Sequence, residues 1–244
     1  MSNNNPNWQF DEFTQVGRDY ADDDEVEVYD ETHAQFRDFA AEAKRALELL
    51  DLKPAASLID VGCGTGNFLI HAAKAGVFVH GADVSKPMLK YAEHKTGDLP
   101  VSLHHAGFLS LDFPDEYFDA ITTTFAFHHL PDFWKGVALE RMNALLKPGG
   151  RIYLCDVILQ PENCMDNIEQ MIQHQYAAGG DFLRDDAIGH FREEFSTYDW
   201  VMEGLFQQAG FNILFNEFEG GLIGTYLCEK PSPSASVPLD PTTL

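Results

Sequence analysis

Between residues 57 and 157, short apolar runs alternate with segments of helical periodicity, and this alternation constrains the fold more than any other feature. The runs typical of buried strands cover residues 57–61, 77–83, 101–107, 118–124 and 151–157. Helices are expected between them at 67–75, 86–95 and 133–146. Strands that alternate with helices pair in parallel, with helices on both faces of the sheet. The pattern therefore predicts a doubly wound α/β fold with right-handed crossovers.

Helices are also expected on either side of this alternation. Apolar residues at helical spacing predict a helix from Glu31 to Leu50. Residues 158–196 contain no predicted strand and form an insert, with one helix around Met165 to Tyr176. A last helix is predicted over 197–209, with Ser196 or Thr197 as its N-cap.

Two strands complete the predicted sheet. Residues 211–218 and 222–229 are joined by Gly220-Gly221 as a hairpin, which adds an antiparallel strand. Before them, Pro148-Gly149-Gly150 is a turn signal ahead of the fifth strand. The predicted fold is a seven-stranded, mostly parallel sheet with one antiparallel strand. The Pro/Ser-rich residues 231–244 are expected to form a disordered tail.

The charge of the chain excludes two classes of partner. Its formal net charge is -23 at pH 7, and no cluster of Lys and Arg interrupts the acidic character. Such a chain repels phosphate backbones and anionic membrane surfaces, so neither nucleic acid nor a membrane is expected as a partner. Monomer and homodimer both remain open.

The N-terminus and the cysteines indicate a cytoplasmic protein. The first residues lack the basic and apolar regions of a signal peptide, and no apolar run approaches the ~20 residues of a membrane span. The four cysteines have neither CxxC spacing nor a Cys/His metal pattern, so reduced thiols are expected.

A glycine-rich loop follows the first predicted strand. Glycines occupy positions 62, 64 and 66, and such a loop directs backbone N–H groups and a helix N-terminus toward an anion. A dinucleotide fingerprint GxGxxG starting at Gly62 needs glycine at Asn67, and one starting at Gly64 needs it at Leu69. The spacing therefore disfavours a nicotinamide cofactor.

The run Asp60-x-Gly62-x-Gly64-x-Gly66 resembles the first motif of the class I S-adenosylmethionine-dependent methyltransferases. Asp83 ends the second strand, where that family binds the ribose hydroxyls. Residues 112–130 resemble the family's fourth-strand region, and residues 145–154 its entry into the fifth strand. The resemblance covers roughly residues 50–156, with the motifs in the family's order.

The resemblance implies S-adenosylmethionine as cofactor and assigns most of its contacts. Amides of the glycine loop can hold its carboxylate, and Asp60 favours its ammonium group. Asp83 can accept from both ribose hydroxyls, although an acid that only supports the next helix is an alternative reading. The cofactor-binding residues expected are Asp60, Gly62, Cys63, Gly64, Gly66, Asp83, Val84, Met88, Gly107, Phe108 and Thr123.

One position departs from the family's pattern. The family often has an aspartate after the third strand, and it bonds the amino group of adenine. That position is Gly107 in this chain. The backbone of Phe108 can read the adenine edge instead, but the group that accepts from the amino group is left open.

Three residues are candidates for the side that accepts the methyl group. His128 and His129 follow the fourth strand, near the expected position of the cofactor's sulfur, and Tyr29 precedes the core. Tyr29 can face the acceptor, donate its hydroxyl to the cofactor's carboxylate, or simply pack its helix against the sheet. A phenol or alcohol acceptor needs a general base, whereas a thiol or neutral amine does not. The histidines can equally be structural. A metal held by the pair with Asp156 is not expected, since no further ligand has suitable spacing.

Two segments are expected to cover the site, by analogy with the family. Residues 1–50 form an acidic, helical lid, and the insert at 158–196 interrupts the methyltransferase domain of residues 51–230. Within the insert, Met171, His174 and Tyr176 are expected to wall the acceptor site. Arg192 is a candidate to grip a substrate carboxylate.

The function implied is transfer of a methyl group from S-adenosylmethionine to a small-molecule acceptor by in-line displacement. One alternative is a protein that binds S-adenosylmethionine or S-adenosylhomocysteine without catalysis. Another is an enzyme that uses a modified form of the same cofactor. The sequence does not identify the acceptor.

Overall fold

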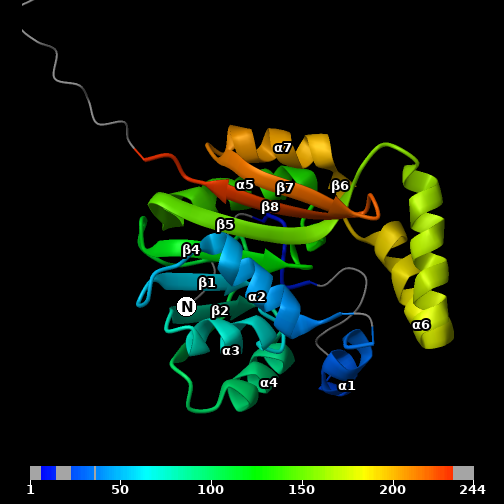
Figure 1. The fold of residues 1–244 in the computed structure, drawn as a ribbon, viewed down its shortest axis with the longest axis horizontal. Helices are drawn as coiled ribbons and strands as arrows, with labels where there is room; N and C mark the ends of the chain where they lie inside the picture. Colours follow the sequence, from blue (N-terminus) through cyan, green and yellow to red (C-terminus); the bar gives the residue numbers. More distant parts are fainter. Residues whose placement is uncertain (1–6, 15–22, 36, 233–244) are drawn as a thin grey trace, which may run out of the picture.

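The computed structural model describes residues 7–14, 23–35 and 37–232 of the chain (Figure 1). Its elements, in chain order, are α1 (Asp23–His33), α2 (Phe39–Leu50), β1 (Ser57–Val61), α3 (Asn67–Lys74), β2 (Phe78–Asp83), α4 (Lys86–Thr96), β3 (Val101–His105), β4 (Phe118–Thr124), η1 (Phe127–His129), α5 (Asp132–Leu145), β5 (Leu146–Leu159), α6 (Cys164–Glu193), β6 (Thr197–Tyr198), α7 (Asp199–Gln208), β7 (Asn212–Glu219) and β8 (Ile223–Glu229).

The described strands form one sheet, and its order confirms the predicted fold class. The order is β3-β2-β1-β4-β5-β8-β7, with the two-residue β6 added beside β5. The antiparallel strand is β8, which runs opposite to both β5 and β7. β1 lies between β2 and β4, so the direction of winding reverses between β1 and β4. In sheets of this kind the crevice outside the carboxyl ends of such strands is where ligands bind.

Successive residues of β1 pack against helices on opposite faces of the sheet, because side chains alternate along a strand. Leu58 is buried in a cluster with Leu69 of α3. Its neighbour Ile59 is buried with Leu139 of α5 and Phe206 of α7. Both faces of the sheet are therefore covered by helices, which explains why β1 has apolar residues at the consecutive positions 58 and 59 rather than only at alternate ones.

The N-terminal helix differs from the prediction. The expected continuous helix from Glu31 to Leu50 is two helices, α1 and α2. Asp38 interrupts the pattern because its side chain accepts hydrogen bonds from the backbone N–H groups of Ala40 and Ala41 and caps α2. A capping aspartate competes with helix continuation, and apolar periodicity alone does not detect it.

Two other local predictions are corrected. Pro148-Gly149-Gly150 does not precede β5 but lies within it, as an irregularity where Phe118 pairs with Leu146 and Ala120 with Arg151. The predicted N-cap of α7 is also wrong, because Tyr198 occupies that position without a side-chain hydrogen bond. Thr197 donates to the Asp132 carboxylate of α5 instead, at 3.0 Å.

The predicted insert is mainly one long element, α6. It runs from Cys164 to Glu193, with non-helical backbone angles at Gly179 and Gly180. Figure 1 shows α6 and α1 beyond the end of the sheet to which the β4 arrow points. The elements that flank the carboxyl ends of the strands thus come from both expected covering segments. None of the helices in the described part of the chain has both the length and the apolar character of a membrane span.

Lys135 joins the end of the insert to the core. It is 2% exposed, and its ammonium group donates to the Asp132 carboxylate at 2.9 Å and to the carbonyl oxygen of Phe195. We expect Lys135→Met to lower the free energy of unfolding by about 1–3 kcal/mol, because the Phe195 carbonyl loses its charged donor. Urea unfolding measures this, with Lys44→Met, whose side chain is 75% exposed, as control. Equal stability of the two variants would contradict the assignment.

Candidate active site

The glycine loop after β1 has a conformation that side chains rarely adopt. Gly62, Gly64 and Gly66 have φ angles of +77°, +51° and +81°. A Cβ atom added to Gly62 would lie 2.3 Å from the Cβ atom of Ala126, so the loops after β1 and β4 touch there. A Cβ atom added to Gly64 would meet nothing within 4 Å, because this residue borders open space.

The amides of this loop already have acceptors within the protein. Gly62 and Cys63 both donate to the carbonyl oxygen of Ala82, at 2.8 and 3.0 Å. Gly66 donates to the Cys63 carbonyl at 3.0 Å. Gly64 donates to Asp83 at 2.8 Å. A ligand carboxylate would therefore have to share these N–H groups with protein acceptors.

Asp83 lies at the end of β2 and holds the loop against that strand. One of its carboxylate oxygens accepts from Gly64 and the other accepts from the backbone N–H of Ser85 at 2.8 Å. Burial raises the pKa of Asp83 above its usual value. The cap of α4 is the Ser85 hydroxyl, which accepts from Met88. Each carboxylate oxygen of Asp83 has a further lone pair for a ligand.

Three cavities lined by described residues meet at this edge of the sheet. The loop cavity, about 110 Å³, is lined by residues that include Glu12, Gly64, Asp83, Val84, Met88, Gly107, Phe108, Thr124 and His129. The Asp60 cavity, about 80 Å³, includes Asp60, Gly62, Cys63, Gly64 and Arg37. The helix cavity, about 830 Å³, lies at α6 and includes Met171, His174, His128, His190, Arg192 and Glu194. Tyr29 lines all three.

Most residues expected at the cofactor lie at the first two cavities, and two do not. Thr123 is fully buried, and its neighbour Thr124 lines the loop and Asp60 cavities instead. Consecutive strand residues face opposite sides of a sheet, so an error of one residue in the prediction, Thr123 for Thr124, selects a side chain on the wrong face. Gly66 also lies away from the cavities, packed toward Ala92 of α4.

Tyr29 and Asp30 place α1 beside the glycine loop. The Asp30 carboxylate accepts from Thr65 at 2.7 Å and from the side-chain amide of Asn67 at 2.9 Å, and it pairs with Lys95. The Tyr29 ring stacks on His33, with centroids 3.9 Å apart. Burial raises the pKa of Tyr29, so its phenol stays protonated at neutral pH. Tyr20, the other tyrosine of the expected lid, lies outside the described residues.

His128 is buried between two carboxylates. Its Nδ1 atom lies 2.5 Å from Asp156 of β5, and its Nε2 atom lies 3.3 Å from Glu194 at the end of α6. Burial lowers the pKa of His128, but the two carboxylates outweigh it, and the pKa lies above its usual value. Burial raises the pKa of Asp156, but the interaction with His128 lowers it by more, so the pKa of Asp156 lies below its usual range.

His129 has the opposite electrostatic environment. Its ring centroid lies 4.4 Å from that of His128. Burial, together with the nearby positive charge of His128, lowers the pKa of His129 to about 4. The surroundings thus favour the charged form of His128 and the neutral form of His129. The two histidines also face different spaces, because His129 lines the loop cavity and His128 lines the helix cavity.

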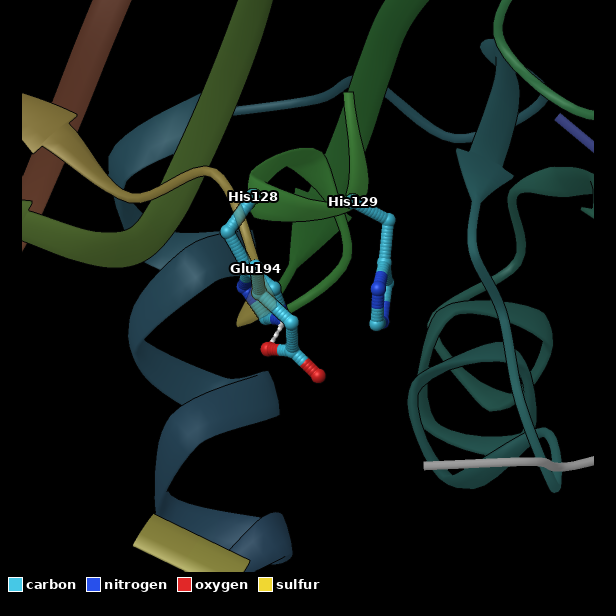
Figure 2. Close-up of side chains that lie close together, drawn as sticks. All are labelled: His128, His129 and Glu194. Atoms are coloured by element: carbon cyan, nitrogen blue, oxygen red, sulfur yellow. Dashed lines mark ion pairs between the residues drawn. The ribbon is translucent and has the colours of Figure 1, made fainter. Parts of the chain in front are cut away.

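The structure supplies a third potential metal ligand that the sequence spacing missed. Figure 2 shows Glu194 facing His128, with His129 beside them, and potential ligand atoms of the three lie within 4.8 Å of one another. Sequence spacing gave no sign of this third group, which comes from the end of α6. Glu194 also lies against His190, however, and the raised pKa of His128 favours a charged imidazole that balances part of the negative charge of this cluster without a metal ion.

The expected wall of the acceptor site is partly as predicted. Met171 and His174 line the helix cavity, whereas Tyr176 is exposed and lies against Arg184. Arg192 lines the cavity as well, but its guanidinium group donates to Glu193. It is therefore not a free cation poised for a substrate carboxylate.

The sequence matches known methyltransferases over most of its length. A family described as a methyltransferase domain matches residues 58–150. An uncharacterized methyltransferase of Geobacillus sp. strain WCH70 is 33% identical over 208 residues, which cover 84% of this chain and 92% of that protein. The chain belongs to the class I S-adenosylmethionine-dependent methyltransferases.

Two further comparisons place this methyltransferase within the family. A demethylmenaquinone methyltransferase of Bacillus licheniformis is 30% identical over 212 residues, covering 80% of this chain and 85% of that protein. The solved structure of an S-adenosylmethionine-dependent methyltransferase from Mesorhizobium loti has a TM-score of 0.58 at 16% identity, covering 78% of this chain and 96% of that chain. At this identity the structural likeness shows the fold alone.

Sequence reasoning missed several residues of the methyltransferase site. Glu12 and Phe10 reach the loop cavity from the N-terminal segment, and Arg37 lines the Asp60 and helix cavities. No motif identifies them, because they reach the site from outside the recurring strand–loop units. For Glu194 there was a signal: an acidic residue that is buried needs a cationic partner, and the paired histidines are the obvious one.

The charged state of His128 makes the stability of this methyltransferase depend on pH. The folded pKa lies above the unfolded value of 6.5, so the stabilisation by the charged imidazole is fully present below that value and is lost as pH rises through the folded pKa. We expect His128→Asn to lower the free energy of unfolding by about 3 kcal/mol near pH 6.

The difference between the wild type and His128→Asn should shrink as pH rises through the folded pKa of His128, because the imidazole then becomes neutral in the wild type too. Urea unfolding at a series of pH values measures it, and the exposed His94→Asn serves as control. A difference that stays constant with pH would show that His128 is not charged in the folded protein.

Proposed function

We propose that this methyltransferase binds S-adenosylmethionine in the loop and Asp60 cavities and transfers the methyl group to a small molecule held in the helix cavity. The observation that carries the proposal is that these three cavities are adjacent and share lining residues. Tyr29 lines all three cavities, and Phe125 lines both the loop cavity and the helix cavity. A ligand that fills the loop cavity would thus lie next to a space large enough for a second molecule.

The chemistry of the two smaller cavities fits this cofactor. Asp83 offers carboxylate lone pairs to a ribose diol, and Val84 and Met88 offer apolar contacts to a purine. Asp60 is buried and accepts one hydrogen bond, from the Thr122 hydroxyl at 2.7 Å, among the described residues. Burial raises the pKa of Asp60 to about 7, so a cationic ligand group would relieve an unfavourable charge. The ammonium group of the cofactor supplies such a charge.

When bound, S-adenosylmethionine supplies an electrophilic methyl group on a sulfonium centre. The residues of this chain would then align the acceptor and exclude water. Neither histidine is suited to take a proton at neutral pH. His128 holds its proton between Asp156 and Glu194, and His129, with a pKa of about 4, is a weak base. We therefore propose that Tyr29 and His128 position the acceptor from the helix cavity, that His129 borders the cofactor from the loop cavity, and that the acceptor needs no general base.

The charges around the helix cavity restrict the acceptor further. Six carboxylates and two guanidinium groups line it: Glu42, Asp185, Asp186, Glu193, Glu194 and Glu219, with Arg37 and Arg192. Arg37 is itself paired with Glu42. This excess of negative charge disfavours phosphate- or carboxylate-bearing acceptors. A neutral small molecule fits better.

A transfer assay distinguishes this function from the alternatives. Radiolabelled S-adenosylmethionine is incubated with the protein and either a metabolite extract or demethylmenaquinone, the acceptor named for the Bacillus relatives. Labelled product supports a methyltransferase, whereas cofactor binding without any transfer favours a non-catalytic binding protein. If the protein does not bind S-adenosylmethionine but binds a modified form of it, the result favours an enzyme that uses that modified cofactor.

Asp83→Asn should weaken binding of S-adenosylhomocysteine by roughly 10- to 100-fold, because the ribose hydroxyls lose a charged acceptor. Isothermal titration calorimetry measures the affinity, and circular dichroism checks the fold. Asp98→Asn, at an exposed position after α4, is the control. Unchanged affinity of the Asp83 variant would remove the ribose assignment.

Gly64 and Gly76 form a matched pair for testing the loop cavity. Both have positive φ angles, +51° and +82°, and an added Cβ atom would meet nothing within 4 Å at either position. Alanine at either should cost a similar free energy of unfolding, about 1–2 kcal/mol. Only Gly64→Ala projects a methyl group into the loop and Asp60 cavities, so it alone should lose cofactor affinity. Equal affinities would place the cofactor elsewhere.

A further inference from the structure

The space beside Gly107 is filled by a side chain from a distant part of the sequence. A Cβ atom added to Gly107 would lie 2.3 Å from the Oε2 atom of Glu12 and 2.5 Å from its carboxyl carbon. The N-terminal segment at residues 7–14 therefore brings a carboxylate to the point where a side chain of residue 107 would begin. Gly107 has no positive φ angle, so its backbone conformation does not require glycine. A side chain is excluded here because Glu12 occupies the space that it would need.

Hydrogen bonds fix the position of this carboxylate. The Oε2 atom of Glu12 accepts from the backbone N–H of Leu109 at 2.9 Å, and Oε1 accepts from the Ser110 hydroxyl at 2.7 Å. Ser110 in turn accepts from the N–H of Gly107 at 2.9 Å. Among the described residues, no Lys or Arg forms an ion pair with Glu12. Burial raises the pKa of Glu12, and the hydrogen bonds from Ser110 and Leu109 partly oppose this effect.

Glu12 lines the end of the loop cavity at which the base of a nucleotide would lie. Val84, Met88, Gly107 and Phe108 line the same cavity. If Asp83 binds the ribose, Glu12 is the carboxylate that remains for the base. The hydrogen bonds from Leu109 and Ser110, with a weaker backbone interaction from Phe108, leave part of the roughly four acceptor sites of a carboxylate open to a ligand amino group.

We propose that Glu12 binds the exocyclic amino group of adenine, in place of a side chain at position 107, and thereby makes the cofactor site selective for adenine. The inference rests on the proposed use of S-adenosylmethionine. It also ties cofactor recognition to the docking of the N-terminal segment. In that segment Phe10 packs edge-on against Phe195, and Trp8 stacks on Trp134, each with ring centroids 6.3 Å apart.

The test compares S-adenosylhomocysteine with S-inosylhomocysteine, in which an oxygen atom replaces the amino group. Calorimetry on the wild type should show a preference of roughly 10- to 100-fold for the adenine compound, because Glu12 accepts from the amino group and repels the oxygen. Glu12→Ala should abolish this preference mainly by weakening the adenine compound. Glu12→Gln should flatten or invert it, because the amide can donate to the oxygen.

A structural role of Glu12 predicts a different result. If Glu12 only supports residues 107–110, Glu12→Ala weakens both compounds by the same factor, and the inference is overturned. It is also overturned if the wild type binds the two compounds equally. Binding of neither compound to the wild type would instead refute the proposed function itself. Asp11→Ala is the control, since this exposed neighbour bonds only Phe13 and Thr14 among the described residues.

Moving the carboxylate back to residue 107 gives a second test. In Glu12→Ala the space beside Gly107 is free of the carboxylate, and the remaining close atom is a side-chain carbon of Val84, 2.7 Å from the added Cβ position. The double variant Glu12→Ala with Gly107→Asp should recover at least part of the adenine preference. Gly107→Asp alone should weaken binding, since two carboxylates would then compete for one space. Failure of the double variant to recover any preference, with the fold intact, would count against the assignment.

Discussion

The contact between Gly62 and Ala126 is the constraint on which the rest of the site depends. The two residues follow β1 and β4, which are neighbours in the sheet although they are distant in sequence, and no side chain fits at position 62. This closeness brings the glycine loop against the segment that carries η1. The glycine loop and the paired histidines therefore share one wall, and a change in either backbone would displace the other.

The histidine–carboxylate cluster performs a different task, because it joins side chains from three elements. The backbone supports the same junction, since the N–H of Phe195 donates to the carbonyl oxygen of His128 at 2.9 Å. His128 comes from η1, Asp156 from β5 and Glu194 from the end of α6. Buried charges of this kind contribute little net stability over apolar residues of the same size, but they are costly to separate. They therefore fix where α6 meets the core, and through it the position of the wall of the helix cavity.

Sequence reasoning succeeded where structure is local or repeated. The bounds of β1 and β4 are those predicted, since apolar runs bounded by turn residues and a glycine loop determine them. It failed at the N-terminal segment, where Glu12 docks on residues 109–110 through contacts separated by 97 and 98 positions. It also failed to find Glu194, whose position depends on how α6 packs. Periodicity carries no information about which distant surfaces meet, so the contacts that the covering segments make could not be predicted, although the segments themselves were expected.

The break in α6 has a consequence for how this enzyme can diversify. Gly180 has a φ angle of +66° and a ψ angle of -150°, a conformation that essentially only glycine adopts. It joins the two helical segments of α6, and both segments border the helix cavity. The angle between these two helical segments sets the size and shape of the helix cavity, while the glycine loop lies on separate elements. Substitutions near Gly180 can therefore alter the shape of the helix cavity during evolution without changing the loop and Asp60 cavities.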